Sequence, residues 1–204
     1  MTADRLRQIH DVTDNFFFWQ GLRWIPMGAA MLAFATVSSP DVPIPAVLRQ
    51  WIGLPLFAIA LWLSTAVLGR YYAHRFGRVR ADAARHAVRT SVKWLVVYPV
   101  IVVAIFVDAK LRPPVVVSAL AFAIAIEAYR QSTGGGRHHY VIAAIGLVAF
   151  SILPIFDVLP AGKYSLTPLI GIIGLIYIVG GVLDHRELVR VLAPIREEEH
   201  VSSI

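Results

Sequence analysis

Hydrophobic residues lie in six long stretches of this chain, and short polar segments separate them. The stretches cover about residues 16–37, 48–70, 92–109, 114–131, 139–157 and 165–184. A helix needs about 20 apolar residues to cross the roughly 30 Å of hydrocarbon in a bilayer. The pattern therefore predicts an all-α, polytopic integral membrane protein with six transmembrane helices.

The composition agrees with this interpretation. The chain has 204 residues, of which 57% are hydrophobic and 16% are charged, whereas soluble domains average about 45–50% apolar and about 25% charged residues. It has no cysteine, which excludes a disulfide framework, thiolate metal sites and thiol nucleophiles. The N-terminus lacks the small-residue cleavage signature of a signal peptide, so we expect the first apolar stretch to be retained.

The distribution of Lys and Arg predicts the orientation, because the cytoplasmic connections of membrane proteins carry an excess of both. With the N-terminus inside, fourteen of the 19 fall in cytoplasmic segments. Both termini are therefore predicted to be cytoplasmic, in a bacterial cytoplasmic membrane. The expected divisions are an N-terminal segment at 1–15, a transmembrane domain at 16–184 and a cytoplasmic tail at 185–204, which begins as a helix and ends in disorder.

The predicted cytoplasmic connection at residues 71–91 is the most basic part of the chain. Its arginines include Arg75, Arg78, Arg80, Arg85 and Arg89. Near an anionic leaflet each basic residue contributes about 1 kcal/mol of attraction, so lipid headgroups are the expected partner. Docking of an acidic cytoplasmic protein is the alternative. No nucleic-acid partner is expected, because no recognition-helix or RNP-like pattern accompanies the charge.

Charged residues also lie within or at the ends of the spans. Arg23 and Glu127 lie inside predicted spans near the same membrane face, and unpaired charges in hydrocarbon are costly. We expect Arg23 to extend to the interface, to pair with Glu127, or to face a ligand. Asp108, Asp157 and Asp184 lie at span ends, where interfacial helix caps are favoured over proton carriers.

Glycines in the last stretch indicate close helix packing. Gly171, Gly174 and Gly180 allow another backbone to approach. The approaching helix belongs either to the same chain or to a second copy in a homo-oligomer.

No signature of catalysis or of a cofactor is present. The chain has no GxSxG, Walker A or HExxH motif, and the adjacent His138 and His139 point in different directions on a helix. We therefore expect no cofactor, no metal and no enzymatic activity. The pattern favours a small multi-pass protein that is transport-related or pore-forming. One alternative is a membrane anchor or sensor that recruits a cytoplasmic partner through its basic face. A second is an inner-leaflet lipid-modifying enzyme that uses Arg23, Glu127 and the nearby histidines.

Overall fold

The computed structural model describes residues 16–39, 42–76, 83–133, 137–159 and 163–202. Every regular element in these ranges is helical, as the sequence predicts. In chain order they are α2 (Phe16–Trp19), the 3₁₀ turn η1 (Gly21–Trp24), α3 (Ile25–Ser38), α4 (Ala46–Trp62), the π-helical η2 (Leu63–Val67), α5 (Leu68–Phe76), α6 (Ala83–Leu111), α7 (Val117–Ser132), α8 (His138–Ile152), the 3₁₀ turn η3 (Leu153–Phe156) and α9 (Lys163–Ser202).

The helices α5, α6 and α9 extend beyond the apolar stretches that predict them. Because α5 continues to Phe76 and α6 begins at Ala83, the predicted connection at 71–91 is largely helical. At the other end of the chain, α9 has 40 residues and continues to Ser202. The disordered end predicted for the C-terminal tail is therefore wrong for the residues up to Ser202.

Three helices in the described part of the chain are long and apolar enough to cross a membrane. They cover Trp51–Phe76, which runs through α4, η2 and α5, His138–Phe156, and Ser165–Leu192. Many large apolar side chains on the outside of the molecule are also exposed. On α4, Trp51, Leu54 and Trp62 are each at least 60% exposed. Exposed apolar surface on this scale is rare in soluble monomers, so the fold is that of a helical membrane protein.

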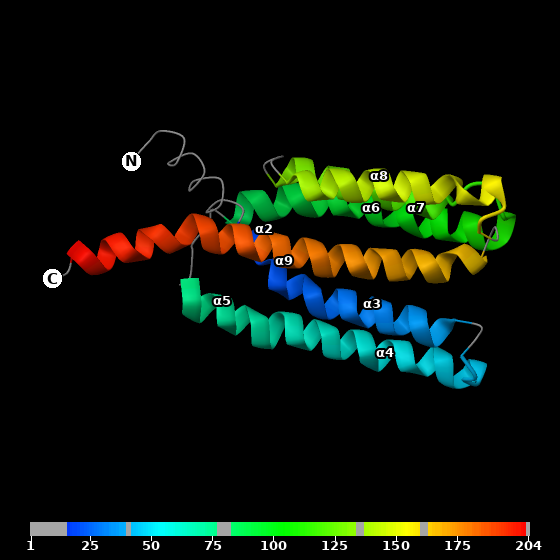
Figure 1. The fold of residues 1–204 in the computed structure, drawn as a ribbon, viewed down its shortest axis with the longest axis horizontal. Helices are drawn as coiled ribbons and strands as arrows, with labels where there is room; N and C mark the ends of the chain where they lie inside the picture. Colours follow the sequence, from blue (N-terminus) through cyan, green and yellow to red (C-terminus); the bar gives the residue numbers. More distant parts are fainter. Residues whose placement is uncertain (1–15, 40–41, 77–82, 134–136, 160–162, 203–204) are drawn as a thin grey trace.

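The helices form two groups that meet along α9. Figure 1 shows α3 and α4 on one side of α9, and α6, α7 and α8 on the other. The closest packing of α9 is with α3 and η1, while α7 packs between α6 and α8. We call α2 to α5 together with α9 the seam half, and α6, α7 and α8 the second half.

Paired glycines hold α3 and α9 together in the seam half. A Cβ atom at Gly28 would lie 2.5 Å from the carbonyl oxygen of Gly174, and one at Gly181 would lie 2.5 Å from that of Gly21. Real Cβ atoms do not approach other atoms so closely, so the two backbones touch at both points. Gly174 and Gly181 are seven residues apart on α9, a spacing that keeps them on one face over two turns, and Gly21 in η1 and Gly28 in α3 have the same separation.

Apolar packing joins the two halves away from these glycines. Leu169 and Ile173 on α9 are buried against α7 and α8, where Leu147 and Phe150 are also buried. Within the second half, small side chains such as Ala121 let α7 lie close to α6. The interior along this part of the bundle is therefore apolar, which makes the buried charges near one end of it conspicuous.

Candidate functional site

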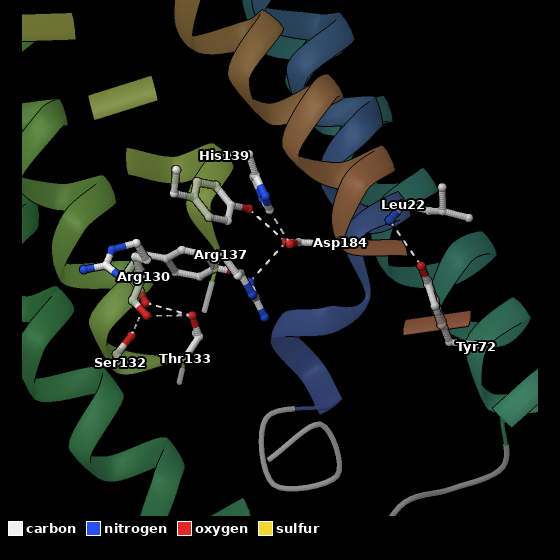
Figure 2. A network of polar contacts seen from close by, with 10 residues as sticks. Leu22, Tyr72, Arg130, Ser132, Thr133, Arg137, His139 and Asp184 are labelled. Carbon is white, nitrogen blue, oxygen red and sulfur yellow. Dashed lines mark hydrogen bonds and ion pairs between the residues drawn. The ribbon is translucent and has the colours of Figure 1, made fainter. Parts of the chain in front are cut away.

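A carboxylate is fully buried where α9 passes the start of α8. Asp184 lies on α9, and its side chain is 0% exposed. Figure 2 shows it facing Arg137 and His139 from the second half. Acidic side chains are almost never fully buried unless they are paired. The neighbours of Asp184 therefore determine what this site can do.

Arg137 supplies the opposite charge. It is the residue that precedes α8, and its side chain is 2% exposed. Its Nη1 donates one hydrogen bond to Asp184 Oδ2 and another to the Tyr129 hydroxyl, both at 3.1 Å. The guanidinium also lies over the ring of Trp19, with 4.2 Å between Cζ and the ring centroid, which is a cation–π geometry. Side chains from α2, α7 and α9 therefore converge on one buried arginine.

Tyr140 binds the same carboxylate oxygen. Its hydroxyl donates a hydrogen bond to Asp184 Oδ2 at 2.9 Å. Gly180 lies four residues before Asp184, on the same face of α9, and a Cβ atom there would lie 3.2 Å from the Tyr140 hydroxyl oxygen. The absence of a side chain at Gly180 thus makes room for the tyrosine ring beside α9.

The other carboxylate oxygen has a different neighbour. His139 Nε2 lies 3.3 Å from Asp184 Oδ1. Neither atom has a hydrogen-bond partner among the described residues, although both are buried. The imidazole side chain as a whole is 25% exposed. His139 therefore connects a buried carboxylate oxygen with the surface of the protein.

His185, the next residue on α9, points away from the second half and contacts α5. Its Nδ1 lies 2.9 Å from the hydroxyl oxygen of Tyr72 on α5. The backbone N–H of Leu22 donates to that same hydroxyl oxygen at 3.2 Å. Consecutive residues on a helix point about 100° apart, so Asp184 and His185 reach different neighbours. Together they link polar groups of both halves through α9.

Of the three alternatives expected for Arg23, the pair with Glu127 is not formed. Arg23 Nε donates to the carbonyl oxygen of Ser64 at 3.1 Å, and its Nη1 donates to Gln20 Oε1 at 2.9 Å. Ser64 lies in η2, and such π-helical turns interrupt the regular hydrogen bonds of an α-helix. Arg23 therefore binds a backbone acceptor at a helical irregularity.

Glu127 has its partners on its own helix. Its carboxylate accepts hydrogen bonds from Arg130 at 2.6 and 2.7 Å and from Gln131 at 2.9 Å. Arg23 and Glu127 thus belong to separate contacts, while His139 faces Asp184. A lipid-modifying enzyme would need Arg23, Glu127 and a histidine in one site, and these side chains lie in separate contacts.

The structure describes only part of the predicted basic surface. Arg75 is exposed at the end of α5, and its guanidinium lies 5.9 Å from the centroid of the Tyr71 ring. Arg78 and Arg80 lie outside the described residues, and the side chains of Arg85 and Arg89 on α6 also lie outside them. Lipid contact through this surface stays a prediction.

The glycines predicted for helix packing lie in contacts within the chain. Gly174 touches the backbone of Gly28, and Gly180 faces Tyr140. A Cβ atom at Gly171 would lie 3.7 Å from Cβ of Ala35, which is ordinary packing. A homo-oligomer through the same helix stays a prediction.

Asp184 is the main correction to the sequence-based view of the site. The interfacial cap predicted at this position is a fully buried partner of Arg137, which belongs to a segment predicted to be cytoplasmic. A signal was nevertheless present, because residues 137–140 (RHHY) and 184–185 (DH) lie at the same predicted face on neighbouring helices. Polar side chains at the same level of two neighbouring helices are close enough to form hydrogen bonds or ion pairs.

Among the described residues, no three His, Asp or Glu side chains come together in a group that could hold a metal ion. The site instead combines a guanidinium–carboxylate pair, an imidazole and hydroxyl groups, which can bind or pass protons. Comparisons with models of known protein families, with curated proteins and with solved structures found no match.

Proposed function

We propose that the chain crosses a bacterial cytoplasmic membrane six times, with both termini and the basic segment on the cytoplasmic side. The three apolar helices support this arrangement. So does α6, on which Leu95, Val102 and Phe106 are each at least 60% exposed. The excess of Lys and Arg in alternate connections supports the orientation.

Labelling of single cysteines tests this topology, because the natural chain contains no cysteine. Arg75→Cys and Gln131→Cys place an exposed thiol at one end of the bundle, and Val158→Cys places one at the other end. A membrane-impermeant maleimide should label the first two only in inverted vesicles and the third only in right-side-out vesicles. Labelling of all three from one side would contradict the proposed topology.

Within this topology, the protein acts as a transport-related membrane subunit. The observation that carries this proposal is the buried Asp184–Arg137 pair, which joins the two halves of the bundle. Ionisable groups inside membrane domains are costly and occur mainly along paths for ions, protons or substrates. A buried pair is also a poor stabilising device, since apolar side chains of similar volume are often as stable or more stable. A role in moving an ion or a solute explains why the pair is present.

Reconstituted vesicles test the transport proposal. Purified protein in vesicles with an imposed proton or sodium gradient, read by pyranine or by a sodium-sensitive dye, should dissipate one of the gradients faster than protein-free vesicles. Asp184→Asn should abolish the difference. Asp157→Asn, at an exposed turn after η3, is the matched control and should keep it. Equal rates with and without protein, for both ions, would contradict ion transport.

The length of α9 favours one second candidate, a membrane anchor or sensor. From Asp184 the helix continues for 18 residues to Ser202, or about 27 Å at 1.5 Å per residue. Figure 1 shows this part of α9 running past the neighbouring helices. Charge reversal at Arg78, Arg80 and Arg85 separates the candidates. Loss of a co-purifying protein with unchanged flux supports the anchor, and loss of flux with the same partners supports the transporter.

A further inference from the structure

We propose that Asp184 and His139 form a proton-binding site that controls how firmly the two halves are joined. In this proposal the proton enters through His139 and binds Asp184 Oδ1, and its arrival weakens the hold of Asp184 on Arg137. The inference rests on the proposed transport function for its purpose, and it names the proton as the coupling ion. The proton site can be tested without measuring transport.

The two oxygens of Asp184 have different environments, and the difference leaves a place for a proton. Oδ2 accepts hydrogen bonds from Arg137 and Tyr140. Oδ1 is buried and accepts no hydrogen bond in the described part of the chain, and its polar neighbour is His139 Nε2 at 3.3 Å. An unsatisfied buried oxygen costs about 1–3 kcal/mol, and more when it is charged. A proton on Oδ1 would remove that cost without displacing either donor from Oδ2.

His139 provides the route between this oxygen and water. Its Nε2 lies 3.3 Å from Oδ1, while a quarter of its side chain is exposed. Figure 2 shows the imidazole pointing at the carboxylate from the start of α8. An imidazole can accept a proton from water on one occasion and release it to a neighbouring carboxylate on the next. The transfer needs no other reactant, because the imidazole returns to its neutral form as Asp184 becomes neutral.

The charged and titratable groups around Asp184 set the consequence of protonation. They come from every element packed against it: Arg137, His139 and Tyr140 from the start of α8, Tyr129 from α7, Tyr72 from α5, and His185 from α9 itself. Arg137 is the permanent cation in direct contact. When Asp184 becomes neutral, the buried guanidinium loses the charge of the carboxylate that it contacts. Burial of a cation is less favourable when a neighbouring anion is removed, so protonation favours movement of Arg137 toward water.

Movement of Arg137 would act on the contact between the two halves. At this end of the bundle, Arg137 and Tyr140 of the second half bind Asp184 of the seam half, and Arg137 also lies on Trp19. Further along, the halves are joined by apolar side chains such as Leu147 and Ile173, which do not respond to pH. Protonation therefore loosens one end and leaves the other closed, as an ion-coupled transporter requires.

Infrared difference spectroscopy of the full chain in lipid bilayers tests the site. As the pH is lowered, the wild-type protein should gain a carbonyl band of a protonated carboxylic acid that Asp184→Asn lacks. Asp184→Glu should shift this band, and Asp108→Asn should retain it. His139→Gln should leave the band in place at equilibrium and slow its appearance after a pH jump by about 100-fold, a typical contribution of a positioned proton carrier.

The outcomes separate this inference from the proposed function. A carboxylic acid band that is identical in wild type, Asp184→Asn and Asp184→Glu would overturn the proton site, even if reconstituted vesicles dissipate a gradient. A band assigned to Asp184 in a protein that moves no ion would keep the proton site and would overturn transport. An unchanged rate in His139→Gln would overturn the route through His139.

Discussion

Two carboxylates are buried at opposite ends of α7, and they are satisfied in different ways. Asp108, at the end of α6, is 1% exposed and accepts hydrogen bonds from the backbone N–H groups of Val117 and Ser118 at 2.8 Å and from the Ser118 hydroxyl. These donors are neutral and lie within ten residues of it. Asp184 depends instead on a cation 47 residues away in the chain.

The difference teaches what kind of role each carboxylate has. Asp108 caps the first turn of α7, where N–H groups have no acceptor within the helix and a negative charge is favourable. Such a cap is complete in itself and needs no movement. Asp184 has a cation on one oxygen and an open second oxygen beside His139. Asp108 thus has a structural role at the connection between α6 and α7, whereas the contacts of Asp184 suit the proposed proton site.

The largest effect is expected from breaking the pair at Asp184. Arg137→Gln leaves a buried carboxylate without its cation, so the free energy of unfolding should fall by about 3–5 kcal/mol. Reversible unfolding in mixed micelles measures it. Addition of Asp184→Asn should restore much of the loss, because both charges are then gone. Arg75→Ala, at an exposed position, is the control and should change the free energy of unfolding little. A change as small for Arg137→Gln would show that the buried pair does not depend on the cation.

The second effect concerns the glycine contact that places Asp184. A Cβ atom at Gly21 would lie 2.8 Å from Cβ of Asp184 and 2.1 Å from the Gly181 carbonyl oxygen. A Cβ atom at Gly181 would in turn lie 2.5 Å from the Gly21 carbonyl oxygen, so Gly181→Ala should destabilise the protein by about 1–3 kcal/mol through overpacking. The same substitution at Gly146 on α8, where nothing lies within 4 Å, should be neutral or stabilising in the same unfolding assay. Equal effects at the two glycines would show that the backbones are not in contact.

The third prediction addresses Asp108. Asp108→Ala removes the cap from α7 and should lower the free energy of unfolding by about 0.5–2 kcal/mol. Because the two carboxylates share no partner, the double variant Asp108→Ala with Arg137→Gln should show the sum of the single effects within about 0.5 kcal/mol. A larger deviation would mean that the two ends are energetically coupled.

The smallest effects are expected from the hydroxyl groups that bind the two carboxylates, and double-mutant cycles distinguish them better than the size of each effect. Tyr140→Phe and Ser118→Ala each remove one hydrogen bond and should each cost about 0.5–1.5 kcal/mol. In double-mutant cycles, Tyr140→Phe should couple to Arg137→Gln, since both side chains bind Asp184 Oδ2. Ser118→Ala should not couple to it. Coupling of the same size in both cycles would mean that the two carboxylates do not differ in their dependence on Arg137.

The helices could be predicted from the sequence because each depends on its own residues. All six apolar stretches are helical, since hydrophobicity and helix formation are local properties. The ends of α6 and α9 were predicted less well. Ala and Arg make up half of segment 83–92, and Arg, Leu and Glu make up most of segment 186–199. These good helix formers extend a helix beyond the apolar residues. The polar composition that indicated a connection or a tail did not reveal this extension.

The site could not be predicted, because it depends on how distant helices meet. The pair of Asp184 and Arg137 requires α8 and α9 to lie side by side with their polar ends at one level. That alignment follows from contacts such as Gly21 with Gly181 and Tyr140 with Gly180, which no single stretch of sequence specifies. The alternative in which Arg23 pairs with Glu127 is not formed for the same reason, since equal depth in the membrane does not make two helices neighbours.

The helix α9 extends well beyond its contacts with α3 and η1. The helix contacts the backbone of α3 at Gly174 and that of η1 at Gly181, and it then continues to Ser202. A small tilt of α9 about these two contacts would move the end of the helix by a larger distance, in proportion to the length of helix beyond them. A tilt of α9 that begins at Asp184 would therefore displace the end of the helix more than the residues beside the carboxylate.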